Sequence, residues 1–205
     1  MMIYEKWKGR ILILLTTALA VWLLYHRADA ETNVEGKVLR FHVIANSDSE
    51  ADQALKYQVK NILVEALKPM LSGAEDLADT KVILQEKLPD IRAIAEEAVA
   101  AYGNGEDIQV ELTNMYFPMK SYGELTFPAG YYDALRVTIG QAEGKNWWCV
   151  LFPNLCFMDV VHGVMPEESK EQLKNVLTEE EYESLFQWGK SPYRIRWRFL
   201  EFFTR

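Results

Sequence analysis

Apolar periodicity predicts that the first half of the chain folds into one strand followed by helices. Residues 38–45 are rich in apolar and β-branched residues, and Leu39, Phe41 and Val43 alternate with Arg40, His42 and Ile44, which is typical of a strand with one clearly apolar face. From residues 50–71, apolar residues recur at spacings of three and four, which predicts an amphipathic helix. Residues 74–88 and 90–102 repeat that spacing on either side of Pro89, where we expect one helix to end and the next to begin.

The second half changes to a period of two and then returns to helical spacing. Residues 107–116, 134–140 and 147–152 are predicted strands with short connections, which favours an antiparallel meander. Residues 166–177 and 178–186 are predicted helices. The chain is therefore expected to be an α+β protein: an N-terminal strand and helical block, an antiparallel strand meander, and C-terminal helices.

The last segment supports two interpretations. From residue 193 to 199, apolar residues alternate with three arginines, which is typical of a strand. From residue 199 onward, phenylalanines recur at helical spacing, which is typical of a basic amphipathic helix. Both alternatives remain open for residues 190–205.

The N-terminus carries a targeting pattern. Residues 11–25 contain no charge and follow three basic residues, and an Ala-Asp-Ala sequence occupies positions 28–30. Fifteen helical residues reach roughly 22 Å, which is shorter than a bilayer core of about 30 Å. Residues 1–30 are therefore predicted to be a cleaved signal peptide or an N-terminal membrane anchor, and residues 31–205 a single exported domain.

Charge narrows the possible partners. The chain has a formal net charge of −8, and residues 31–205 alone carry 18 basic and 28 acidic residues, a net of −10. This balance argues against nucleic-acid binding by phosphate neutralisation and against attraction to anionic lipid. We expect membrane contact only through residues 1–30, if they remain attached.

The two cysteines have six residues between them, and an oxidising compartment would favour a Cys149–Cys156 disulfide. The alternative is a pair of buried thiols that behave as small hydrophobic groups. Two cysteines and no HExxH sequence give no recognisable zinc site, so we expect no metal and no cofactor.

A polar cluster follows the first predicted strand. It contains His42, Asn46, Ser47 and Asp48. Sites often form at strand ends, so His42 and Asp48 suggest an exported hydrolase as one alternative. The other interpretation is a turn and a helix N-cap, which the same residue types favour. Because no established hydrolase motif accompanies the cluster, we predict no catalytic residues and no enzyme.

Aromatic residues concentrate in the predicted connections and in one strand. Surface aromatics are enriched at protein–protein interfaces, so this set is a candidate partner-binding surface. The alternative is a satellite core beneath long connections. The set comprises Tyr116, Phe117, Tyr122, Phe127, Tyr131, Tyr132, Trp147 and Trp148.

Two blocks carry a resemblance to a known family. Residues 42–56 (HVIANSDSEADQALK) and 144–157 (GKNWWCVLFPNLCF), with Tyr-Phe-Pro at 116–118 and Phe-Pro-Ala-Gly-Tyr at 127–131 between them, resemble the stage II sporulation protein R family. The resemblance covers about residues 36–160.

This resemblance implies a signalling role in endospore formation. Members of the family are exported from the forespore into the space between forespore and mother cell. There they activate a membrane-embedded aspartic-type protease of the mother cell, which processes the pro-form of sigma-E. The resemblance thus implies an activator that is secreted, or anchored by residues 11–25, and whose partner is that protease.

Overall fold

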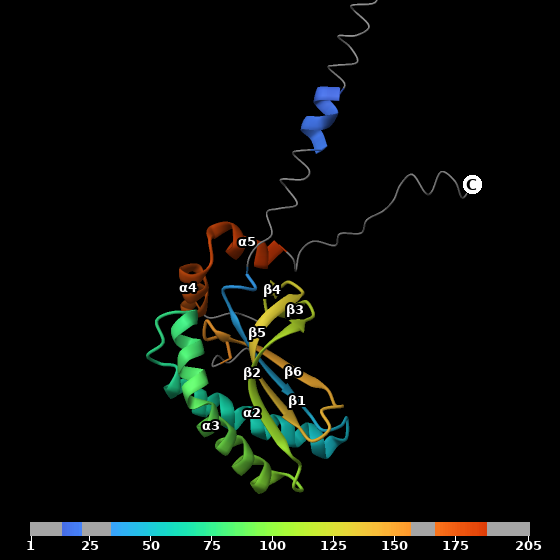
Figure 1. Cartoon of the computed structure of the whole chain (residues 1–205), viewed down its shortest axis with the longest axis vertical. Coiled ribbons are helices and arrows are strands. Elements are labelled where there is room, and N and C mark those ends of the chain that lie inside the picture. Colours follow the sequence, from blue (N-terminus) through green and yellow to red (C-terminus); the bar gives the residue numbers. More distant parts are fainter. Residues whose placement is uncertain (1–13, 22–33, 157–166, 188–205) are drawn as a thin grey trace, which may run out of the picture. The chain divides into compact units, whose positions relative to one another are not determined.

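The computed structural model describes residues 14–21, 34–156 and 167–187 (Figure 1). The chain divides into two compact units, Met1–Asn33 and Val34–Arg205. Within the first unit, residues 14–21 are helical.

None of the helices in the described residues is long and apolar enough to cross a membrane. Most of the apolar run at 11–25 lies outside those residues, so its role as signal or anchor stays a prediction.

A four-stranded mixed sheet forms the centre of the second unit, in the order β2-β5-β1-β6. Strand β5 is antiparallel to β2 and parallel to β1, and β1 is antiparallel to β6. The strands are β1 (Leu39–Ile44), β2 (Ile108–Phe117), β5 (Gly130–Ile139) and β6 (Asn146–Phe152). A separate two-stranded hairpin, β3 (Lys120–Tyr122) with β4 (Leu125–Phe127), occupies what the sequence suggested was a plain connection.

The α+β class is confirmed, but the sheet is more than a meander. Strands β2 and β5 pair as consecutive antiparallel strands, as predicted. Strands β5 and β6 are not neighbours, because β1 lies between them. Every β1 residue except Ile44 is buried, and a strand covered on both faces is most stable in the middle of a sheet.

Two long helices cover one face of the sheet. They are α2 (Glu50–Met70) and α3 (Leu77–Tyr102), and they pack on the apolar side chains of β1, β2 and β5. Ser49 caps α2 by accepting a 3.1 Å hydrogen bond from the backbone N–H of Asp52. Such a cap satisfies a donor that the first turn leaves unpaired.

The predicted break at Pro89 is wrong, because α3 continues through it. Pro89 and Gln85, whose carbonyl loses its helical partner, both lie on the exposed side of α3. Leu84 and Ile91, on either side of the proline, are buried against the sheet. Water can therefore satisfy the orphan carbonyl while tertiary packing holds the helix together.

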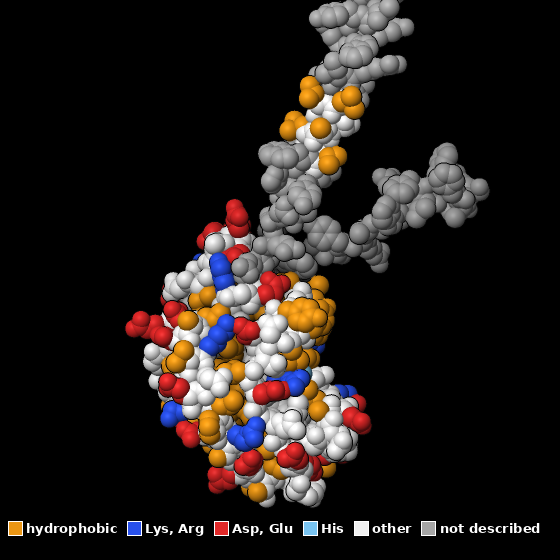
Figure 2. Space-filling model, viewed as in Figure 1, with side chains coloured by type: hydrophobic (Ala, Val, Ile, Leu, Met, Phe, Trp, Pro, Cys, Tyr) orange, Lys and Arg blue, Asp and Glu red, His pale blue; other side chains and the backbone are white. Residues whose placement is uncertain are grey.

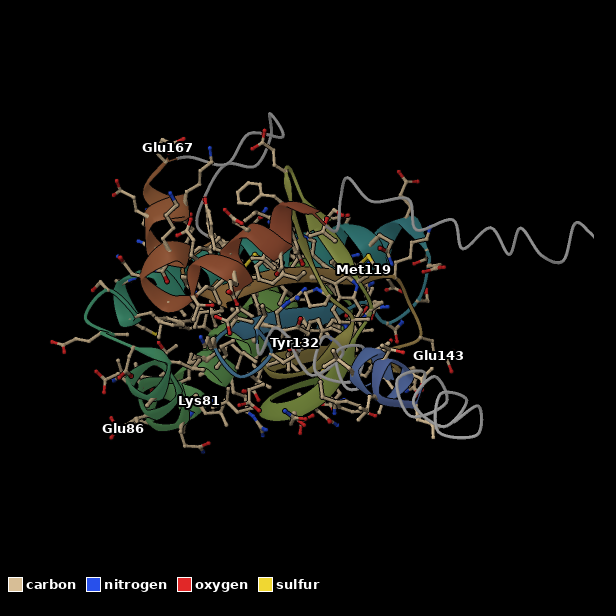
Figure 3. All side chains as sticks on the ribbon, turned by 90° about the horizontal axis from the view of Figure 1, so that it is seen from above. Lys81, Glu86, Met119, Tyr132, Glu143 and Glu167 are labelled. Atoms are coloured by element: carbon tan, nitrogen blue, oxygen red, sulfur yellow. A yellow bond between two sulfur atoms is a disulfide. The ribbon has the colours of Figure 1, made fainter. Side chains whose placement is uncertain are left out.

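The other face of the sheet carries a second core. Helices α4 (Glu167–Val176) and α5 (Glu179–Gln187) and the β3–β4 hairpin close over it. Figure 3 places Tyr132 centrally, with Glu167 of α4 and Glu86 of α3 at the outside on opposite sides. The two predicted C-terminal helices are thus present, whereas residues 190–205 lie outside the described residues.

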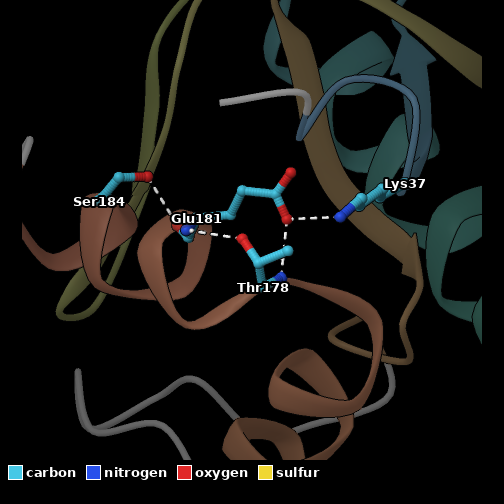
Figure 4. Close-up of polar contacts among 4 residues, drawn as sticks. All are labelled: Lys37, Thr178, Glu181 and Ser184. Carbon is cyan, nitrogen blue, oxygen red and sulfur yellow. Dashed lines mark hydrogen bonds and ion pairs between the residues drawn. The ribbon is translucent and has the colours of Figure 1, made fainter. Parts of the chain in front are cut away.

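An ion pair links the start of α5 to the chain just before β1 (Figure 4). Lys37 Nζ lies 2.6 Å from Glu181 Oε2, and the same oxygen accepts a 2.7 Å hydrogen bond from the Thr178 N–H. Thr178 Oγ1 accepts from the Glu181 N–H at 3.3 Å, which completes a capping box. The cap therefore fixes the helix and also fastens it to the central strand.

Candidate functional site

The eight aromatic residues proposed as a partner surface differ in exposure. Phe117, Phe127 and Tyr132 are fully buried, so they pack the second core and cannot contact a partner directly. Tyr116 and Tyr131 are 54% and 67% exposed. The remaining three, Tyr122, Trp147 and Trp148, are half-buried.

The buried aromatics surround the guanidinium of Arg40, which is itself fully buried on β1. Its Cζ lies 4.6 Å from the ring centroid of Phe117, 5.0 Å from Tyr132, 5.3 Å from Phe127 and 5.7 Å from Tyr122. A cation over ring faces at these distances is attracted by the negative face of each ring. We call these four rings with Arg40 the arginine cage.

Hydrogen bonds satisfy only part of the Arg40 guanidinium. Nε donates to the Cys149 carbonyl at 3.2 Å, and Nη2 donates to the Tyr122 hydroxyl at 2.8 Å. Nη1 has no partner, and no carboxylate pairs with Arg40 among the residues that the structure describes. Burial lowers the pKa of Arg40 and raises the pKa of Tyr122. The aromatic faces therefore take the place of a counter-ion.

The arginine cage explains why the aromatics are buried. The sequence placed Arg40 on the polar face of its strand, and alternation alone gave no sign that this face would be covered. The available signal was an arginine within an otherwise apolar strand, combined with aromatic residues in nearby connections. A buried arginine needs such partners, because an isolated charge is costly to take out of water.

His42, two residues farther along β1, is also buried, with 2% of its surface exposed. Its ring stacks on Trp148 with centroids 3.7 Å apart, and Nε2 lies 2.7 Å from Asn146 Oδ1. Because an amide oxygen only accepts, Nε2 carries the hydrogen, and Nδ1 is left without a partner. Burial lowers the pKa of His42 to about 4, so the ring is neutral near pH 7.

The polar residues after β1 tie this strand end to the turn before β6. Asn46 Oδ1 accepts a 2.9 Å hydrogen bond from the Gln141 N–H. Asp48 Oδ1 accepts one of 2.7 Å from the Lys145 N–H. Asp48 therefore has a partner different from that of His42, and the two do not form a catalytic pair. We call residues 45–48 with residues 140–145 the turn clamp.

The carboxylate of Asp52, in the first turn of α2, organises the same residues. Asn46 Nδ2 donates to Asp52 Oδ2 at 3.0 Å, and the hydroxyl of Ser47 donates to the same oxygen. These hydrogen bonds, that of Ser47 foremost, lower the pKa of Asp52. The geometry thus favours the turn-and-capping interpretation of Asn46, Ser47 and Asp48.

Two glycines allow the turn clamp to close. Gly140 has φ +56°, and a Cβ added there would lie 2.1 Å from Asn46 Oδ1. A Cβ added to Gly144 would lie 2.2 Å from the Ser47 carbonyl oxygen. The backbone segments approach more closely than any larger residue permits, and the Gly144 N–H donates to the Ala45 carbonyl at 2.9 Å.

A disulfide joins Cys149 to Cys156, with Cα atoms 5.6 Å apart, as predicted. The Cys156 N–H also donates to the Val150 carbonyl at 3.0 Å. The loop after β6 is therefore fastened to the edge of that strand. No group of three or more His, Cys, Asp or Glu residues that could hold a metal occurs among the described residues, which do not include His162.

The exposed aromatics lie together at one end of the sheet. Tyr116 and Tyr131 are register partners in the β2–β5 pair, and their ring centroids are 5.7 Å apart. Met119, just beyond β2, is 49% exposed. Figure 2 shows hydrophobic side chains gathered on the surface of this domain. Tyr116 and Tyr131, which we call the tyrosine patch, offer an exposed aromatic surface for binding.

Truncating Arg40 should destabilise the domain through the arginine cage. We expect Arg40→Ala to lower the free energy of unfolding by about 2–4 kcal/mol, because it leaves a cavity lined by rings and removes the cation–π attraction. Arg40→Met fills most of the space without a charge to desolvate, so it should cost less. Urea denaturation measures both; equal stability of Arg40→Ala and the unsubstituted chain would contradict the cage.

His42 should make the fold less stable in mild acid. Its folded-state pKa of about 4 lies below the ordinary value of 6.5, so the unfolded chain binds the proton first as the pH falls. Between these values, stability should decrease with falling pH by up to about 1.4 kcal/mol per pH unit. Urea denaturation from pH 7 to 4 should show this slope reduced in His42→Phe, which keeps the stacking ring. If the unfolding free energies of the two proteins changed equally with pH, His42 would not be the titrating group.

Gly144→Ala should open the turn clamp. The added Cβ meets the Ser47 carbonyl, so we expect a loss of about 1–3 kcal/mol in unfolding free energy. Gly73→Ala is the matched control, because a Cβ there meets no atom within 4 Å. Thermal or urea denaturation of the pair tests this; equal stabilities would show that the close approach relaxes at no cost.

The similarity to known proteins covers the residues of the candidate site. The family model described as stage II sporulation protein R matches residues 35–162, which contain β1 through β6 with the arginine cage and the turn clamp. A curated protein of Bacillus subtilis (strain 168) named "Stage II sporulation protein R" is 36% identical over 143 residues. The match covers 69% of this chain and 64% of that relative, so the chain spans less than two thirds of the relative's length.

No solved structure gives a significant match. The family assignment therefore rests on sequence, over most of the chain and at an identity well above chance. The chain belongs to the stage II sporulation protein R family.

Proposed function

We propose that this chain is an exported signalling protein of endospore formation that activates a membrane-embedded aspartic-type protease of the mother cell. The activated protease would then process the pro-form of sigma-E. Membership of the stage II sporulation protein R family supports the role in sporulation. The tyrosine patch is the observation that carries the binding role, because exposed aromatic side chains beside a rigid core are what protein partners use as anchors.

The tyrosine patch is well placed to act as a rigid anchor. Tyr116 and Tyr131 stand on paired strands, and their neighbours in sequence, Phe117 and Tyr132, form walls of the arginine cage. Side chains held by a packed support lose little conformational entropy on binding. The buried aromatics thus contribute to the proposed interface by positioning the exposed ones.

Activation would work by shifting the conformational equilibrium of the protease. A partner that binds the active form more tightly than the inactive form raises the population of the active form. A change from 1:99 to 99:1 requires about 5.5 kcal/mol of differential affinity. At about 2 kcal/mol each, Tyr116 and Tyr131 would supply about 4 kcal/mol of this amount, and further contacts would supply the rest.

Export is part of the proposal. The basic and apolar start of the chain is typical of a signal or anchor, and the disulfide suits an oxidising space outside the cytoplasm. The net charge of −10 on residues 31–205 favours a protein that stays off anionic lipid and reaches a membrane partner through protein contacts. No nucleic acid and no cofactor is required.

The hydrolase alternative has less support. His42 is buried, neutral and paired with Asn146, and its pKa of about 4 is far below that of an efficient base near pH 7. Asp48 is occupied by the Lys145 N–H. The contacts of both groups tie β1 and the residues after it to the region of β6, which is a structural role.

Removing the tyrosine patch should weaken activation without unfolding the domain. We expect Tyr116→Ala and Tyr131→Ala each to weaken the apparent affinity for the protease by roughly 30-fold, which corresponds to about 2 kcal/mol. The measurement is cleavage of pro-sigma-E by the membrane protease, reconstituted with increasing amounts of the full chain.

Tyr102→Ala is the matched control, because Tyr102 is 60% exposed at the end of α3 and outside the tyrosine patch. It should leave activation unchanged. Full stimulation by both patch variants would reject this surface, and no stimulation by the unsubstituted chain would reject the proposed function.

A further inference from the structure

The outer edge of β2 is open along half of its length. The Asp107 carbonyl accepts from the Gly140 N–H, so in this antiparallel pair the odd-numbered residues of β2 direct their backbone groups toward β5. The even-numbered residues direct theirs outward, and Val110 O accepts a 3.5 Å hydrogen bond from Arg92 of α3. In the described part of the chain, no partner takes the outward backbone groups of Leu112, Asn114 and Tyr116.

The opposite edge of the sheet is covered in part by the chain itself. There, the loop after β6 returns along the strand, and the Cys156 N–H donates a hydrogen bond to the Val150 carbonyl, which points away from β1. An uncovered edge strand invites pairing with another strand, and proteins ordinarily cover or charge such an edge. Strand β2 is ten residues long, so its open half is a place where one more strand fits.

A groove runs beside the open edge, between β2 and the first half of α3. It encloses about 390 Å³, and its lining combines apolar residues (Leu39, Val82, Leu112 and Ala134) with polar and charged ones, among them the Lys81–Asp133 ion pair. Val82, on α3, is 56% exposed and contributes an apolar side chain to this lining. A strand added to β2 would direct every second side chain into this groove.

On the other face of the same edge, Glu111 presents a carboxylate. Its side chain is 44% exposed, and it pairs with Arg136 on β5. An added strand would therefore meet a groove of mixed lining on one face and the Glu111–Arg136 pair on the other. The apolar part of the groove favours apolar side chains on the first face, and the half-exposed Glu111 carboxylate favours basic ones on the second.

The chain contains one segment with that pattern. Residues 193–199 read Tyr-Arg-Ile-Arg-Trp-Arg-Phe, so four apolar residues alternate with three arginines. They lie outside the described residues. The net charge of −10 on residues 31–205 favours a basic strand against this domain.

The described chain ends at a helix that packs on the hairpin following β2. Helix α5 ends at Gln187 and packs with the β3–β4 hairpin, which follows β2 directly after Phe117. Residues 188–192 can span roughly 17 Å when extended. A strand starting at residue 193 at that end and running toward Leu112 would be antiparallel to β2.

We propose that residues 193–199 add to the outer edge of β2 as a fifth strand of the sheet. Ile195 and Trp197 would fill the groove between β2 and α3, and the arginines would face Glu111. The tail would thereby cover the open edge and extend the surface next to the tyrosine patch. This inference does not depend on the identity of the protease.

Amide hydrogen exchange on the full chain in detergent tests the added strand. The amides of Leu112, Asn114 and Tyr116 should be protected in the unsubstituted chain, since their only available partners would come from the added strand. Trp197→Asp and Ile195→Asp should each speed their exchange by at least about tenfold. Phe202→Asp, in the same tail but beyond the paired segment, is the matched control and should retain the protection.

Two further measurements make the outcome unambiguous. Exchange at Phe41, in the central strand, shows whether each variant is folded. In the unsubstituted sequence background, a photoreactive phenylalanine analogue in place of Trp197 should crosslink to the peptide containing Leu112–Tyr116. Three results would each overturn the proposal. The edge amides could exchange freely in the unsubstituted chain, or their protection could survive Trp197→Asp. Their protection could also rise with protein concentration, which would show that it comes from a second copy.

Discussion

The burial of one positive charge between aromatic rings organises this domain. Arg40 lies on the central strand, and a guanidinium there is costly unless its surroundings replace water. Phe117 comes from the end of β2, Tyr122 and Phe127 from the small hairpin, and Tyr132 from the start of β5. The side chain thus brings the hairpin and the ends of β2 and β5 together around itself. It also determines which aromatics are left at the surface.

The two sequence blocks that carry the family resemblance are physically one unit. The first contains the second half of β1 and the start of α2, and the second contains β6, which pairs with β1 in the sheet. The turn clamp joins them again beyond the strands, through hydrogen bonds from Asn46 and Asp48 to the turn before β6. Gly144 belongs to the same contact, because the chain passes too close to Ser47 for a side chain. About a hundred residues separate positions that are in direct contact.

Local patterns predicted the elements well, because the periods of two and 3.6 reflect which face is buried. They failed where tertiary structure decides. Pro89 does not end a helix, because packing at Leu84 and Ile91 compensates for the lost hydrogen bond. The place of β1 between β5 and β6 has no local signature, since the pairing is between distant segments. For the candidate site, the sequence identified the set of aromatic residues. Which of them are buried, unlike the exposed Tyr116 and Tyr131, depends on the position of Arg40 in the folded domain.

The central place of β1 has a consequence for the order in which the fold can form. The strand comes first in the sheet's sequence, yet both of its partners follow roughly ninety residues or more later. Until β5 and β6 are available, β1 has no edge to pair with, and long loops must close before the sheet gains stability. Such a contact pattern slows folding and keeps the chain unstructured while it is incomplete. Under the export proposed above, that delay would separate translocation from folding in time through topology alone.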